Sequence, residues 1–418
     1  MHIYKKNCNF APEFLTPPGM LITNNSFLCG YFSIPRSLQP LQQGWQKNVC
    51  TAEERANLNN FYFPEFAQCM TAEITMYTLP LNRTCTLDLG EEQVSFLIEN
   101  IRLWEAPFHI VLYAVNIRFE GLEFNLVTRA LNILRNCAYY TSAQREFIDI
   151  ALAPVAAVYG AETSLDMSWL VESGNKFKLF QIVRLSEGIE KGDERLLLYD
   201  AGTLAPHTPL STGINSPAYI DHVLAEHTIS VFAGWTGLAL LDTFTLLSAD
   251  TPERVLHNWE KDYFEKIYIY QLFRKVFLYS VNLHYRRRSE DVAVLESRLS
   301  EFEQRYSYTS ISYNFLPNII NAAMEKSLNT QQDYDQLDKM IGKEIEARRH
   351  RAEERTNNFL TFLTCLTIFS AIYDFASLLN ESFGYDTFFP SGYFGFRLVG
   401  TTLLLIILLV YLFLVRRK

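Results

Sequence analysis

The chain lacks the short motifs by which most enzymes are detected from sequence. It contains no Gly-x-Ser-x-Gly, Gly-x-x-x-x-Gly-Lys, His-Glu-x-x-His or Gly-x-Gly-x-x-Gly pattern. Without these patterns, no nucleophile, phosphate-cradling loop or zinc-protease geometry has local support in the sequence. We therefore predict that the protein is not an enzyme, has no catalytic residue and uses no cofactor.

Closely spaced cysteines and an apolar N-terminal run are also missing. Seven cysteines are scattered along 418 residues without a Cys-x-x-Cys pair, which indicates reduced thiols rather than disulfides or zinc ligands. We therefore expect no metal site. Residues 1–10 lack the run of roughly 7–15 apolar residues that a secretory signal needs. We expect no cleavable signal and an N-terminus in the cytosol.

Basic residues are in deficit. Lysine and arginine number 37 against 46 acidic residues, which gives a formal net charge of −9. Binding to nucleic acid needs a net basic face that neutralises phosphates, so we predict no nucleic-acid partner. A local basic pocket remains compatible with this balance. The composition is 49% hydrophobic and 14% aromatic, so most of the chain has enough apolar residues for a large folded core.

Two long apolar runs stand near the end of the sequence. Residues 359–379 read FLTFLTCLTIFSAIYDFASLL, with Asp374 as the one charge, and residues 398–415 contain no charge. Helices of about 21 and 18 residues approach the thickness of a bilayer, so we predict two transmembrane helices. Basic residues precede the first run and form the tail 416–418. This places both termini in the cytosol, residues 380–397 in an outer loop, and the protein in the inner (cytoplasmic) membrane as a multi-pass protein.

A helical stalk is predicted between the body and the apolar runs. A helix is expected to begin at Thr251 as cap, with Pro252 at its first position, and to break near Pro317. From Gln331 onward the pattern continues into residue 359 without another proline. One helix of about 50 residues would be about 75 Å long. A helix of that length needs partners, and a bundle between chains is the simplest source.

The first 250 residues alternate between strand-like and helix-like segments. Strands are predicted at 19–34, 72–81, 108–119, 177–185 and 195–202, and helices at 126–140 and 143–159. The predicted fold class is therefore an α+β membrane protein. Its parts are a cytosolic α/β sensor domain (1–250), a helical stalk (251–358), two transmembrane helices (359–379 and 398–415), the outer loop (380–397) and the basic tail (416–418).

This order of elements resembles the CorA-type magnesium transporters and their ZntB relatives, and the segment Glu354–Tyr373, ERTNNFLTFLTCLTIFSAIY, resembles the start of their pore helix. The resemblance implies a homopentamer whose stalk and first span line a pore. The family's Tyr-Gly-Met-Asn is replaced here by Tyr373-Asp374-Phe375-Ala376. A subgroup without that motif is the CorA-like effectors encoded beside type III CRISPR systems. They are understood to respond to a nucleotide messenger that joins S-adenosylmethionine to AMP, in antiviral defence.

Two groups of site residues are proposed from the sequence. Arg286, Arg287 and Arg288 are candidates for an anionic ligand, or else form a solvated face paired with Glu290 and Asp291. A pore face is proposed from residues at alternating steps of four and three, namely Asn357, Thr361, Thr364, Ile368 and Ala371. Ordinary helix packing by these hydroxyls is the alternative. Asp374 would form a cation-attracting ring at the outer mouth, or lie exposed at the interface.

Three functions remain open from the sequence. The first is an oligomeric membrane channel gated by a small anionic, nucleotide-type messenger bound to the cytosolic domain, with the lipid bilayer and further copies of the chain as partners. The second is a constitutive divalent-cation transporter for magnesium, zinc or cobalt. The third is a membrane-tethered scaffold without a pore. A gated channel would require that the messenger binds the open state more tightly than the closed state.

Overall fold

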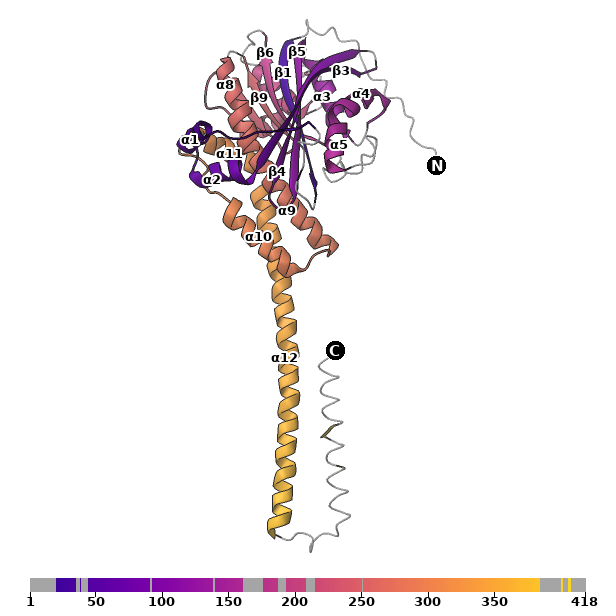
Figure 1. Cartoon of the computed structure of the whole chain (residues 1–418), viewed down its shortest axis with the longest axis vertical. Helices are drawn as coiled ribbons and strands as arrows, with labels where there is room; N and C mark the ends of the chain where they lie inside the picture. Colours follow the sequence, from indigo (N-terminus) through magenta and orange to yellow (C-terminus); the bar gives the residue numbers. More distant parts are fainter. Residues whose placement is uncertain are drawn as a thin grey trace. The chain divides into compact units, whose positions relative to one another are not determined.

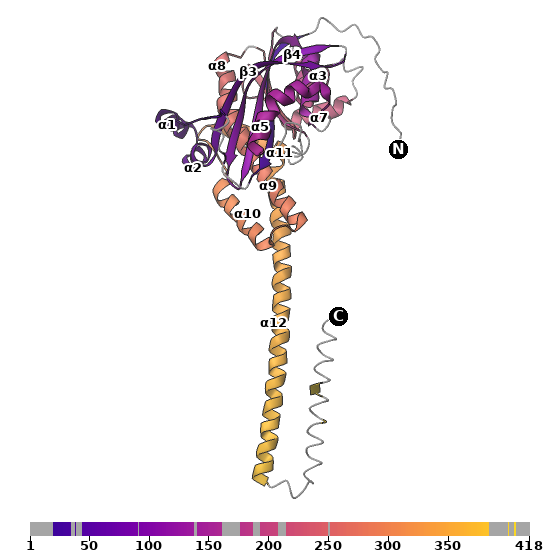
Figure 2. The same ribbon diagram turned by 45° about the vertical axis from the view of Figure 1, so that its right-hand side comes forward.

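The computed structural model falls into two units (Figures 1 and 2). It describes residues 20–34, 38, 44–90, 92–137, 140–160, 176–186, 193–207, 215–249, 251–383, 400 and 405–406. Unit 1 comprises Met1–Glu290 and Ser297–Leu337, and unit 2 comprises Asp291–Glu296 and Asp338–Lys418.

Unit 1 is built on a mixed sheet. Its nine described strands have the order β2-β3-β4-β5-β1-β6-β9-β8-β7. They are β1 (Leu21–Ser33), β2 (Gln46–Lys47), β3 (Thr75–Asp88), β4 (Gln93–Ala106), β5 (Ile110–Glu123), β6 (Lys178–Leu185), β7 (Thr228–Ile229), β8 (Trp235–Ala239) and β9 (Thr243–Ser248). Among these pairs, β6 and β9 run parallel and the others antiparallel. The crossover between β6 and β9 brings the start of both strands to the same end of the sheet.

Helices cover both faces of this sheet (Figures 1 and 2). Those before β9 are α1 (Ala52–Phe61), α2 (Pro64–Gln68), η2 (Cys69–Glu73), α3 (Phe124–Arg135), η4 (Ser142–Gln144), α4 (Arg145–Phe147), η5 (Ile148–Leu152), α5 (Ala153–Tyr159), α6 (Asp193–Thr203) and α7 (Pro217–His227). The helices that follow β9 along the chain are α8 (Glu253–Asn258), the π-helix η7 (Trp259–Tyr268), α9 (Ile269–Arg287), α10 (Val292–Tyr306), α11 (Phe315–Leu328) and α12 (Thr330–Phe383), most of which belongs to unit 2.

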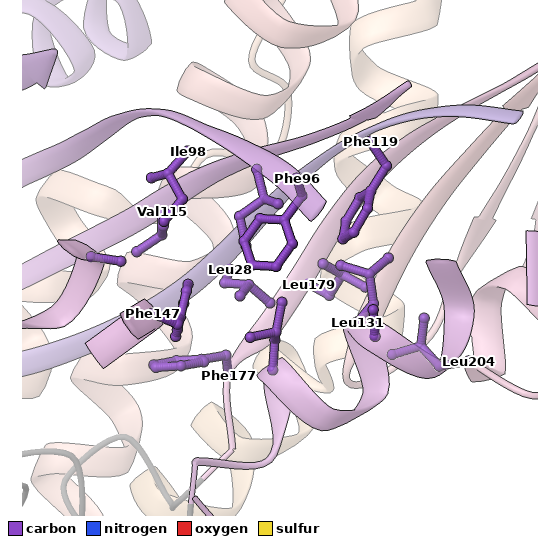
Figure 3. Close-up of a cluster of buried hydrophobic side chains, with 14 of the residues drawn as sticks. Leu28, Phe96, Ile98, Val115, Phe119, Leu131, Phe147, Phe177, Leu179 and Leu204 are labelled. Atoms are coloured by element: carbon purple, nitrogen blue, oxygen red, sulfur yellow. The ribbon is translucent and has the colours of Figure 1, made fainter. Parts of the chain in front are cut away.

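The alternation of side chains along β1 explains the two packed faces. Leu28 points to one face, where Figure 3 shows it with Phe96, Phe119 and Leu131 of α3 in a buried apolar cluster. The neighbouring Phe27 points to the opposite face, where its ring stacks on Phe264 of η7 with centroids 4.0 Å apart. A strand buried on both faces reads as a continuous apolar run, as residues 27–29 do.

Close packing between β1 and β5 makes Gly30 sensitive to substitution. A Cβ atom at Gly30 would overlap the fully buried ring of Tyr113, reaching 2.8 Å from its Cε1 and still closer to Cζ. Gly30→Ala should therefore destabilise the protein by about 1–3 kcal/mol, measured by urea unfolding. Gly342→Ala in α12 is the matched control, because a Cβ there meets nothing within 4 Å. An alanine at position 30 that unfolds at the wild-type urea concentration would contradict this packing.

The helix α12 is 54 residues long, about 80 Å at the usual rise, and contributes most of unit 2. None of its described side chains beyond Ile341 is buried. Within unit 2, Arg348 Nη1 forms an ion pair with Asp291 Oδ1 at 3.0 Å. A helix of this kind receives little stabilisation from packing within its own chain.

The predicted membrane architecture is wrong on the described residues, because no helix among them is long and apolar enough to cross a membrane. Residues 359–379 form the C-terminal part of α12, where Asp374 and several threonines interrupt the apolar run. This corrects the α+β membrane fold class, the ion-channel and transmembrane-helix descriptions, and the inner-membrane localisation. Residues 384–397 of the predicted outer loop, the second run 398–415 apart from residues 400, 405 and 406, and the tail 416–418 lie outside the described residues.

Candidate anion-binding site

A cluster of charged side chains lies where β6 and β9 begin. It consists of Arg135, Lys176, Lys178 and Asp242, and is called the β6 basic cluster below. Two backbone hydrogen bonds hold its parts together: the Phe177 N–H donates to the Arg135 carbonyl, and the Leu179 N–H donates to the Asp242 carbonyl, both at 2.9 Å. The end of α3, the start of β6 and the turn before β9 therefore meet at one place.

The Asp242 carboxylate bridges both lysines. Lys178 Nζ lies 2.6 Å from Oδ1, and Lys176 Nζ lies 3.3 Å from Oδ2. Lys178 Nζ also donates to the Leu241 carbonyl at 2.9 Å, which fixes its position independently of the carboxylate. The three side chains are 25% to 39% exposed. The ammonium groups are thus ordered and still reachable from solvent.

Arg135 joins the cluster through its backbone carbonyl, which accepts the N–H of Phe177 between the two lysines. Its residue is only 6% exposed, and its buried Nε has no hydrogen-bond partner among the described residues. Burial lowers the pKa of Arg135, against the opposing charge of Asp242. A buried guanidinium N–H without a hydrogen-bond partner is costly, so the site favours an added acceptor with negative charge.

The electrostatics of the other members are consistent with a cationic site. Burial lowers the pKa of Lys178; its bond to Asp242 opposes the shift, while the charges of Lys275 and Arg135 add to it. Burial acts to raise the pKa of Asp242, but Lys178, Lys176 and Arg135 outweigh it and hold that pKa below its ordinary value. Lys275 has its own partner, Asp333, at 2.6 Å.

The arginines proposed from the sequence lie elsewhere. Arg286, Arg287 and Arg288 are exposed at the end of α9, and Arg286 Nε donates to Asn282 Oδ1 at 2.9 Å. The two carboxylates offered as their partners bind other residues. Glu290 pairs with Arg298 at 2.8 Å, and Asp291 pairs with Arg348 at 3.0 Å. No described contact joins the three arginines to one another. Their role in ligand binding stays a prediction.

The residues proposed as a pore face lie on α12. Asn357, Thr361, Thr364, Ile368 and Ala371 are all exposed and follow one stripe of the helix. The hydroxyl of Thr361 donates to the Asn357 carbonyl at 2.7 Å, and that of Thr364 to the Leu360 carbonyl at 2.8 Å. Asp374 is also exposed but lies roughly 100° around the helix from the middle of this stripe.

Sequence reasoning missed the β6 basic cluster. A usable signal was the pair Lys176 and Lys178 on either side of Phe177, at the start of a predicted strand. Nothing in the sequence placed Arg135 or Asp242 beside that pair. Among the described residues, no group of three or more histidine, cysteine, aspartate or glutamate side chains could hold a metal ion.

In comparisons with known proteins, the chain matches no family model and no curated protein. The resemblance to CorA-type transporters, and to the CRISPR-associated effectors among their relatives, therefore stays a prediction carried by the sequence segment Glu354–Tyr373.

Proposed function

We propose that the protein is a ligand-responsive homo-oligomer. Unit 1 binds a small anionic ligand at the β6 basic cluster, and α12 associates with the same helix of other copies. The main observation in support of an anionic ligand is the buried Arg135, whose Nε lacks a hydrogen-bond partner among the described residues. The nearby Lys176 and Lys178 share one carboxylate. Charge-assisted bonds to such groups are the strong ones in anion recognition.

Self-association is supported by the surface of α12. Large apolar side chains are 41% to 60% exposed along a stripe opposite the polar one, namely Phe359, Phe362, Leu363 and Leu366. Contiguous apolar surface of this kind marks interaction sites. A second copy of α12 is the fitting partner, because the identical apolar stripes at residues 359–366 of two copies can cover each other.

The ligand would act by preferring one arrangement of the oligomer over another, since a ligand shifts an equilibrium only by its differential affinity. The sequence resemblance favours a nucleotide-type messenger, for which AMP and the conjugate of S-adenosylmethionine with AMP serve as the two probes. Pore formation, gated or constitutive, is not part of this proposal because it requires membrane-spanning helices.

Binding of AMP and of the S-adenosylmethionine–AMP conjugate, measured by isothermal titration calorimetry on the full chain, tests the ligand. Lys178→Met should weaken binding about 10- to 100-fold, because each charge-assisted bond contributes roughly 1.5–3 kcal/mol. The triple variant Arg286→Met, Arg287→Met, Arg288→Met is the control and should bind like the wild type. If the triple variant loses binding while Lys178→Met keeps it, the end of α9 is the ligand site and the β6 basic cluster is not.

A further inference from the structure

We infer that the β6 basic cluster takes a terminal phosphate group and that Asp242 is an internal counter-ion which the phosphate displaces. This inference rests on the proposed function and names the ligand class and the competitor at the same site. It is carried by the placement of the Asp242 carboxylate, whose two oxygens each occupy one lysine ammonium.

The charge of the cluster selects the class of anion. Three cationic groups act on one carboxylate, so the formal balance of Arg135, Lys176, Lys178 and Asp242 is +2. A phosphate monoester carries about −1.5 to −2 near neutral pH and presents three oxygens. A phosphodiester carries one negative charge and presents two free oxygens. The monoester therefore matches both the charge and the number of cations.

The geometry allows Asp242 to give way without disturbing the fold. Its side chain is 37% exposed, so the carboxylate can rotate into water. Its backbone stays in place because its carbonyl accepts the Leu179 N–H. Lys178 also stays in place, held by the Leu241 carbonyl. A phosphate that replaces the carboxylate would then take over both lysine ammonium groups, within the field of the Arg135 guanidinium, whose charge already acts on Asp242 and Lys178.

If Asp242 is a displaceable counter-ion, neutralising this residue of the site should tighten binding. Asp242→Asn keeps the size and the acceptor oxygen but removes the competing charge. We expect it to bind AMP about tenfold more tightly than the wild type does, measured by calorimetry at fixed ionic strength. Asp333→Asn is the matched control, since it removes the same charge from the neighbouring Lys275, outside the cluster. It should change AMP affinity threefold at most.

Two probes with the same base separate the ligand classes. AMP has a terminal phosphate, whereas 3′,5′-cyclic AMP has a phosphodiester, and the wild type should bind AMP at least tenfold more tightly. Equal affinity for the two would overturn the terminal-phosphate assignment. Unchanged or weaker AMP binding by a folded Asp242→Asn, with wild-type binding intact, would overturn the counter-ion role alone.

Failure of the underlying function gives a different result. If the wild type and Asp242→Asn both unfold cooperatively on heating yet bind neither AMP nor the S-adenosylmethionine–AMP conjugate, the anion site itself is wrong. Weak AMP binding that Lys178→Met leaves unchanged points to the same conclusion, because the probe then contacts another surface.

Discussion

Leu363→Glu combined with Leu366→Glu should abolish the proposed self-association and leave the protein monomeric. Both side chains are exposed in the isolated chain, at 41% and 46%, on the apolar stripe of α12. Burying a leucine contributes about 1.5–3 kcal/mol, and the two glutamates would add like charges facing each other in every copy. This loss of association free energy per subunit should raise the protein concentration at which half of the oligomer dissociates by more than 100-fold. Light scattering coupled to gel filtration gives the mass directly.

The opposite stripe of α12 provides the control. Thr361→Glu adds the same charge to the same helix, at a residue whose hydroxyl already bonds to the Asn357 carbonyl. It should leave the oligomer intact. If Thr361→Glu dissociates the protein and the leucine pair does not, the interface is the polar stripe. A wild-type monomer at micromolar concentration contradicts self-association, and binding of that monomer to phosphatidylcholine vesicles would identify lipid as the occupant of the apolar stripe.

Segments with strong local patterns were readable from the sequence. The segments 19–34 and 177–185 contain the whole of β1 and β6, and the segments 72–81 and 108–119 contain the first parts of β3 and β5. Residues 195–202 were predicted as a strand but lie in α6. That segment, RLLLYDAG, has three leucines and no β-branched residue, and leucine is among the better helix formers. The strand prediction there was wrong because apolar content alone does not distinguish the two structures.

Helix ends depended on tertiary contacts that the sequence could not show. Thr251 was predicted to cap the helix, but its hydroxyl donates to the Gly234 carbonyl and Pro252 is the residue before the first turn. A break was predicted near Pro317, and the helices are interrupted at residues 307–314. Pro317 itself lies in the first turn of α11, where its missing N–H has no intrahelical partner to lose.

The candidate site was hidden for a topological reason. Lys178 and Asp242 are separated by 64 residues and meet because β6 and β9 are parallel neighbours. Arg135 joins them because α3 ends beside the start of β6. Strand order is set by packing across the whole sheet. A single sequence therefore identifies the charged residues but does not show which of them lie together. In the apolar run of α12 the local pattern itself was misleading. Its composition predicted a transmembrane helix, but the described helix is not long and apolar enough to be one.

The other large effect is expected at Arg102, which joins β4 to η7. Its guanidinium is 7% exposed and pairs with Glu260 and with Glu265, the latter at 2.8 Å. It also lies 5.3 Å from the centroid of the Phe27 ring. Arg102→Met keeps the volume but leaves two carboxylates beside the sheet without their shared cation. Removing one partner of a buried pair costs about 3–5 kcal/mol.

Urea unfolding should therefore give a much lower midpoint for Arg102→Met than for the wild type. Arg184→Met is the control, because its pair with Glu253 is exposed, at 47% and 80%, and such pairs contribute at most about 1 kcal/mol. Adding Glu265→Gln to Arg102→Met should restore part of the lost stability, since it removes one of the orphaned charges. A double variant less stable than Arg102→Met would mean that Lys261, 3.0 Å from Glu265, already neutralises that carboxylate, and that Arg102 stabilises the fold by packing on Phe27.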